Sequence, residues 1–159
     1  MLKYGQKVFL KNYGAGLVID KEYKEYLNKK EEKYVLLYFL LDGIKMHIPI
    51  KNFKNYSIRD INTQDDILKN LNKIKTTPDF IEEKWNKRYK QNNKKISTGI
   101  LEKQCEIIRD LRYLKMEKKL PPVEQKMLKR VQGLVASEIS LAFDISLEMS
   151  YNKIKTISK

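Results

Sequence analysis

Residues 84–95 combine cations with large aromatic rings and contain no acidic side chain. This run holds six Lys or Arg residues together with Trp85 and Tyr89, and Trp85 is the single Trp of the 159-residue chain. Lys and Arg neutralise phosphates without reading sequence, and a ring among them can stack on a base or wedge into an opened base step. The run therefore indicates binding to nucleic acid.

Two interpretations of Trp85 remain open at this point. On a helix, Trp85 and Tyr89 would share one stripe with Ile81, Asn92 and Ile96. That stripe could anchor the helix to its neighbours, with the Lys and Arg residues on the solvated face. Alternatively, Trp85 lies partly exposed near the helix start and meets a base, while the cations hold the flanking phosphates.

Other reactive side chains are sparse in this chain. There is one His, His47, and one Cys, Cys105, and no spacing of His, Cys and Asp is typical of a zinc site. Cys105 lies beside Ile107 and Ile108, which predicts a buried, inert thiol. Because no general acid, base and oxyanion site come together, we expect neither an enzyme nor a metal, cofactor or small-molecule substrate.

The bulk composition narrows the class of protein. The chain is 42% hydrophobic and carries a formal net charge of +13, which the base composition of an AT-rich genome could also produce. No apolar run reaches the roughly 18 to 20 residues of a membrane span, and no secretory signal is apparent. We therefore expect a cytoplasmic protein without membrane contact. A single Cys excludes an intramolecular disulfide framework.

The first sixty residues are predicted to form a sheet. Short runs rich in β-branched and aromatic residues are separated by turn signals, of which Asp42-Gly43 is typical of a hairpin. Pro49 lacks an N–H and should lie on an edge strand. The pattern predicts a small, strongly bent sheet or barrel. The expected strands cover residues 7–10, 16–19, 34–40 and 45–50.

From Thr63 onward the apolar period becomes helical. Thr63, Asp79 and Ser146 are expected to cap helices, and Pro121-Pro122 to end one helix and begin the next. The chain is thus predicted to be an α+β protein with a β domain at 1–60 and a compact all-α domain at 61–159. After the first helix, the others are expected at roughly 80–96, 100–119 and 122–143, with a last one after Ser146.

Several segments, in this order and spacing, resemble the CarD/CdnL family of bacterial transcription regulators. The likeness covers nearly the whole chain and is strongest across 85–142. In the β half it rests on shorter matches around Gly5, Gly14 and His47. The helical segments that carry it are 85–90, 97–99, 106–111, 124–128 and 136–142.

The resemblance implies a Tudor-like RNA polymerase interaction domain followed by a helical DNA-binding domain. The first would bind the polymerase β subunit, partly by strand pairing. The second would contact promoter DNA in the minor groove at the upstream edge of the bubble, without reading sequence. Binding there would stabilise the open complex and place the protein at the nucleoid through the polymerase.

The family pattern assigns expected roles to individual residues. Trp85 matches the residue that wedges into the opened minor groove, and His47 lies where relatives often carry Arg in the polymerase-facing strand. Pro121 replaces a Ser or Thr that often caps the fourth helix. The remaining expected polymerase contacts are Lys24 and Tyr26, and the remaining expected DNA contacts are Lys84, Lys87, Arg88 and Lys90.

Two rival functions remain. A general nucleic-acid-binding protein would bind DNA or RNA tightly without polymerase. A protein-interaction adaptor would keep Trp85 as buried core, so that Trp85→Ala would unfold the helical domain.

Overall fold

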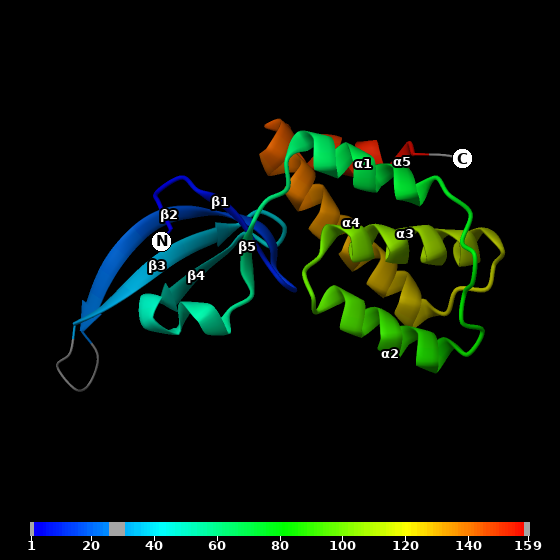
Figure 1. Ribbon diagram of the computed structural model, residues 1–159, viewed down its shortest axis with the longest axis horizontal. Coiled ribbons are helices and arrows are strands. Elements are labelled where there is room, and N and C mark those ends of the chain that lie inside the picture. Colours follow the sequence, from blue (N-terminus) through cyan, green and yellow to red (C-terminus); the bar gives the residue numbers. More distant parts are fainter. Residues whose placement is uncertain (1, 26–30, 158–159) are drawn as a thin grey trace.

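The computed structural model describes residues 2–25 and 31–157, and it divides into a sheet and a group of helices (Figure 1). The described sheet is antiparallel with the strand order β4-β3-β2-β1-β5. This confirms the predicted α+β class with the sheet first and the helices second. The strands are β1 (Lys7–Leu10), β2 (Gly14–Glu25), β3 (Glu31–Phe39), β4 (Ile44–Pro49) and β5 (Ile58–Asp60), with a short 3-10 helix, η1 (Ile50–Asn55), before β5.

The sheet contains the four predicted strands, but β2 (Gly14–Glu25) is much longer than the expected 16–19, and one strand is added. The turn at Asp42-Gly43 joins β3 to β4, and Gly43 adopts a positive φ of 66°. Pro49 ends β4, which is an edge strand as predicted. The short strand β5 was not predicted, because three residues give little periodicity. It pairs with β1 and forms the other edge. A register shift between Val18 and Asp20 interrupts the ladder of the long strand β2, as in a β-bulge.

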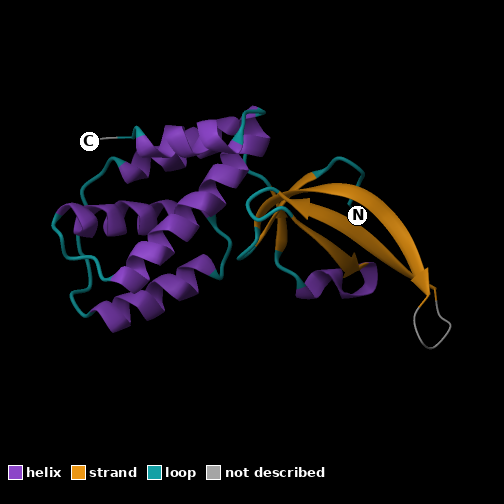
Figure 2. Cartoon of the chain, turned by 180° about the vertical axis from the view of Figure 1, so that it is seen from behind, coloured by secondary structure: helices purple, strands orange, loops and turns teal. Residues whose placement is uncertain are grey.

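The described helices lie at the other end of the molecule (Figure 2). Thr63 caps α1, because its hydroxyl accepts from the Asp66 N–H at 3.2 Å, and Ser146 caps α5 in the same way through Met149. Both caps are as predicted, and Pro122 begins α4 as expected. The helices are α1 (Gln64–Ile74), α2 (Trp85–Ile96), α3 (Leu101–Met116), α4 (Pro122–Phe143) and α5 (Leu147–Lys155).

The expected start of the second helix at Asp79 is wrong. Residues 79–84 form an irregular segment, and α2 begins only at Trp85, with Lys84 in the N-cap position and no side-chain cap. The carbonyls of Glu82 and Glu83 accept from the Arg88 guanidinium instead of helical N–H groups. The position of the helix start therefore depends on a tertiary contact of Arg88, which the sequence pattern around Asp79 does not reveal.

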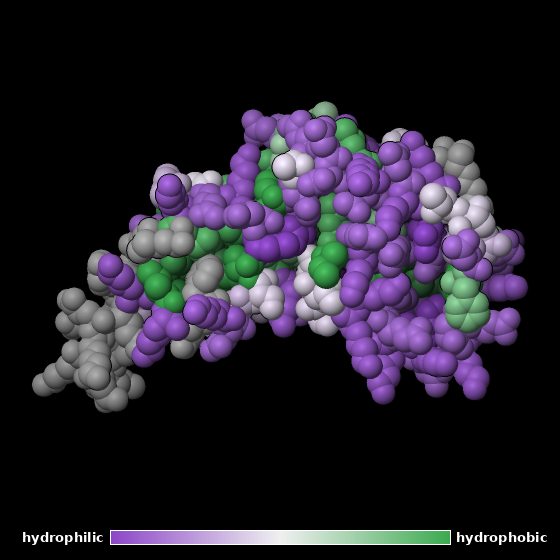
Figure 3. All heavy atoms as spheres, in the orientation of Figure 1, coloured by the Kyte–Doolittle hydropathy of each residue, from purple (hydrophilic) through white to green (hydrophobic). Residues whose placement is uncertain are grey.

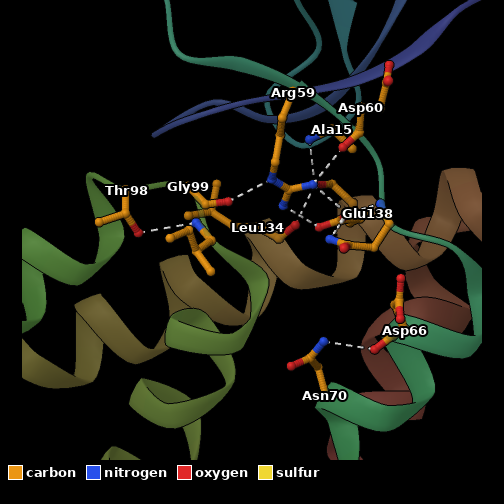
Figure 4. A network of polar contacts seen from close by, with 12 residues as sticks. Ala15, Arg59, Asp60, Asp66, Asn70, Thr98, Gly99, Leu134 and Glu138 are labelled. Atoms are coloured by element: carbon orange, nitrogen blue, oxygen red, sulfur yellow. Dashed lines mark hydrogen bonds and ion pairs between the residues drawn. The ribbon is translucent and has the colours of Figure 1, made fainter.

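A buried carboxylate joins the sheet to the helices. Glu138 of α4 is fully buried and accepts two hydrogen bonds from Arg59 of β5, both at 2.8 Å, and two from Asn62. The Arg59 Nε donates to the Gly99 carbonyl at 2.9 Å, and the guanidinium lies 4.2 Å over the Phe9 ring. Figure 4 shows Arg59 reaching from the sheet to Glu138 and Gly99.

Close backbone contacts extend this junction. The Ala15 N–H donates to the Ser137 hydroxyl at 2.9 Å, and a Cβ at Gly14, whose φ is +93°, would lie 2.7 Å from that hydroxyl oxygen. Phe9 and Ala15 of the sheet belong to the same buried cluster as the helix cores. The sheet and the helices therefore share one packed interface, and the expected boundary near residue 60 stays a prediction.

Glu138→Gln tests the strength of this junction. The substitution keeps the side-chain shape but leaves Arg59 without its carboxylate, so the free energy of unfolding should fall by roughly 3–5 kcal/mol. Chemical denaturation measures this loss. Glu148→Gln, on the exposed first turn of α5, is the matched control and should change stability little. Equal stability of the two variants would contradict the role assigned to Glu138.

Candidate nucleic-acid interface

Trp85 is the first residue of α2 and is 50% exposed. A Trp that served only as core would be almost fully buried, as Ile107 and Ile108 of α3 are. The structure therefore favours the interpretation in which Trp85 lies partly exposed at the helix start. A half-exposed indole keeps one part packed on the protein and leaves another part free to meet a ligand.

The buried face of α2 is rotated from the expected stripe. Arg88, Asn92 and Ile96 are the buried residues of this helix, and Tyr89 is half-buried against the helix core. Tyr89, Asn92 and Ile96 are thus buried or partly buried, as the stripe predicted. In the first turn, however, Arg88 is buried and Trp85 is not. The sequence pattern missed this because it treats an Arg as solvated.

Arg88 does not lie on the exposed surface, which corrects its expected role as a DNA contact. It is only 6% exposed, and its Nε and Nη2 donate to the Glu124 carboxylate at 2.7 and 2.5 Å. Glu124 is fully buried in the first turn of α4. A guanidinium engaged in this way cannot reach a phosphate without leaving a buried carboxylate unpaired, at a large cost in free energy.

The other predicted cations are exposed at the start and in the first turns of α2. Lys84, Lys87 and Lys90 are exposed, and the Lys87 Nζ lies 3.6 Å from a Glu82 carboxylate oxygen. Lys94, one turn beyond Lys90, is exposed as well and was not among the expected contacts. The face that contains α2 is hydrophilic and carries long projecting side chains (Figure 3). Such a row of Lys side chains can follow a phosphate backbone.

Phe80 is a second exposed aromatic residue just before this helix. It is 76% exposed in the segment that leads into α2, whereas its neighbour Ile81 packs against the helix core. Pattern analysis did not single out Phe80, because one apolar residue in a polar loop carries no periodic signal. Exposure of Phe80 and Trp85 gives the outer end of the helical part an apolar component among its cations.

Two of the predicted polymerase-binding residues, Lys24 and His47, belong to the sheet, at the other end of the molecule from α2 (Figure 1). His47 is exposed on edge strand β4, and its ring meets the Tyr34 ring edge-on at 6.4 Å between centroids. Lys24 lies in β2 opposite Glu32 of β3, and its side chain is outside the described part. Tyr26 lies outside the described residues. An edge strand can accept a further strand from another chain.

The one thiol is buried away from both surfaces. Burial raises the pKa of the Cys105 thiol to about 12, and the nearby Glu138 carboxylate adds to this shift. The thiol is therefore protonated and a poor nucleophile at neutral pH. Among the described residues, no group of three or more His, Cys, Asp or Glu side chains could hold a metal ion. No described helix has the length and apolar character needed to span a bilayer.

An antiparallel sheet with an open edge, fused to helices whose outer end presents Trp85 and exposed lysines, defines a two-part protein with two separate surfaces. Comparison with known proteins agrees with this class. The family model described as "CarD, C-terminal domain" matches residues 66–155. YdeB of Bacillus subtilis (strain 168), named as a candidate transcription factor, is 30% identical over 148 residues, which cover 89% of this chain and 92% of YdeB. The chain belongs to the CarD/CdnL family of transcription regulators.

Trp85→Ala should leave the protein folded. Because Trp85 is half exposed, its truncation should lower the free energy of unfolding by less than about 2 kcal/mol, against roughly 3–5 kcal/mol for a fully buried Trp. Thermal and chemical denaturation measure this difference. Ile108→Ala, at a fully buried site of α3, should cost more and shows that the assay detects core loss. Unfolding by Trp85→Ala would restore the adaptor interpretation.

Proposed function

We propose that this protein binds the RNA polymerase β subunit through its sheet and contacts promoter DNA through the start of α2. The DNA contact would lie at the upstream edge of the transcription bubble and would stabilise the open complex. The carrying observation is the half-exposed Trp85 at the start of a helix that also carries exposed lysines. Membership in the CarD/CdnL family supports the proposal.

The proposed mechanism is a shift between two promoter states. In the closed complex the bases are stacked in duplex DNA, and in the open complex the edge of the bubble offers an unstacked step. A ring that contacts this step binds the open state more tightly than the closed one. It moves the equilibrium by that difference in affinity and by no more. The lysines would hold the flanking phosphates in both states and add affinity without sequence preference.

In the proposed mechanism this protein does not select a DNA sequence alone. The exposed cations of α2, Lys87, Lys90 and Lys94, are all lysines, and the buried Arg88 is engaged with Glu124. A lysine ammonium binds phosphates anywhere along the backbone, so these contacts supply affinity without sequence preference. We therefore propose that the polymerase–promoter complex determines where the protein contacts DNA. Tethering to the polymerase raises the local concentration of the Trp85 surface near that DNA.

Open-complex lifetime tests the DNA contact. With purified polymerase and a promoter, wild type should prolong the lifetime, and Trp85→Ala should lose most of that gain. Stacking on a base is worth about 1–3 kcal/mol, or roughly 5- to 150-fold. Lys87→Gln should lower the lifetime moderately and reduce its salt dependence by about one phosphate contact.

The controls separate this proposal from its rivals. Tyr4→Ala removes an exposed aromatic residue near the start of β1 and should leave the lifetime gain intact. Trp85→Ala should bind polymerase without DNA as well as wild type does. Tight DNA or RNA binding without polymerase, together with no effect on the open complex, would favour the general nucleic-acid-binding protein.

The polymerase contact is tested on edge strand β4. His47→Arg should strengthen binding to the isolated β subunit and His47→Glu should weaken it, each by roughly two- to fivefold, as expected for a single exposed charge. Titration calorimetry measures the affinities. Lys69→Glu on the exposed face of α1 is a matched charge reversal and should have no effect. Equal affinities for both His47 variants would exclude this strand from the contact.

A further inference from the structure

Arg88 connects three parts of the helical domain through one guanidinium. Its Nε and Nη2 bind Glu124 at the start of α4, and its Nη1 donates to the Glu82 carbonyl at 2.7 Å. The Nη1 also lies 3.5 Å from the Glu83 carbonyl. Arg88 itself follows Trp85 by three residues, so the two side chains leave the same first turn of α2. The ion pair thus fixes both the helix start and the segment that leads into it.

The start of α2 has little other support of its own. Lys84, the N-cap residue, provides no side-chain hydrogen bond to the first N–H groups, unlike Thr63 and Ser146 in α1 and α5. An uncapped helix end frays more easily. Ile81, four residues before Trp85, packs against the helix core and is the other anchor of the segment. Between Ile81 and Arg88 further polar contacts are local, such as the Lys84 N–H to the Glu82 carboxylate at 3.4 Å, whereas the guanidinium joins the segment to α4.

The carboxylate side of the pair is well placed to hold the guanidinium. Glu124 is the third residue of α4, so its charge lies near the positive end of the helix dipole. Two parallel hydrogen bonds to a carboxylate fix the plane of an Arg side chain, which a single contact does not do. With that plane fixed, the third nitrogen points to the Glu82 carbonyl.

We propose that the Arg88–Glu124 pair is a positioning element that holds Trp85 half exposed for its contact with the bubble edge. The proposal rests on the proposed function for the DNA step, but the positioning itself does not depend on it. Arg88 acts through Trp85 and touches no DNA. Apolar residues of similar volume would maintain the packing between α2 and α4, but they would release the Glu82 and Glu83 carbonyls and the helix start.

The double substitution Arg88→Met/Glu124→Leu separates positioning from folding. Replacing both members of a buried ion pair by apolar residues is often neutral for stability, so the full-length variant should melt close to wild type. The single Trp makes indole fluorescence a direct report on Trp85. Without DNA or polymerase, its anisotropy should fall. Because Trp85 is 50% exposed in the wild type, its full release would raise the acrylamide quenching constant about twofold.

Two further variants complete the design. Arg59→Met/Glu138→Leu removes a second Arg–Glu pair, in which Glu138 is buried and Arg59 is partly exposed at the sheet junction, and should leave Trp85 anisotropy and quenching unchanged. Arg88→Lys retains a charge beside Glu124 but loses the planar fork. Arg88→Lys should change the anisotropy and the quenching constant in the same direction as the double variant, by a smaller amount. If the double variant does not fold, Arg88→Lys tests the positioning role instead.

The outcomes are distinct. A folded Arg88→Met/Glu124→Leu variant with wild-type anisotropy and quenching overturns the proposal. Released Trp85 together with a lost gain in open-complex lifetime supports it fully. Released Trp85 with an undiminished lifetime gain overturns the link between positioning and DNA contact. If wild type itself does not prolong the open complex, the fluorescence results still decide the positioning, and only the proposed function fails.

Discussion

The buried carboxylate of Glu138 is the constraint on which the arrangement of the molecule depends. Its charge is removed from water, so it is tolerated only because Arg59 and Asn62 supply four hydrogen bonds from the end of the sheet. Those donors can meet Glu138 in one relative placement of β5 and α4. The ion pair therefore selects the orientation of the sheet against the helices, while the shared apolar core around Phe9 and Ala15 provides most of the burial.

A second Arg–Glu ion pair lies at the start of α2. Arg88 and Glu124 form a buried pair whose remaining donor holds backbone carbonyls, as Arg59 holds the carbonyl of Gly99. In both pairs the Arg joins segments that are distant in sequence. The exposed lysines of the candidate interface join no such segments; they are solvated and available to phosphates. Arg59 and Arg88 thus help to hold the frame together, whereas the lysines of the candidate interface are exposed.

The sequence predicted the parts of the structure that are encoded locally. The presence of four strands, the hairpin turn at Asp42-Gly43, the edge position of Pro49 and the caps Thr63 and Ser146 depend on neighbouring residues and were confirmed, whereas the length of β2 was not. The start of α2 and the burial of Arg88 depend on Glu124, which lies 36 residues away. A pattern that treats every Arg as solvated could not find them. For the candidate site, the cation-rich run was visible, whereas the choice between a buried and an exposed Trp85 required the tertiary structure.

The open edge at β4 has a consequence for self-association. A strand edge that can accept a strand from another protein can also accept one from a second copy of the same chain. Here the edge is short, it ends in Pro49 without an N–H, and exposed Lys45 and His47 alternate along it. Two such edges brought together would add the like charges of two Lys45 side chains to one ladder. The missing N–H of Pro49 and the exposed Lys45 therefore disfavour edge-to-edge pairing of two copies through β4.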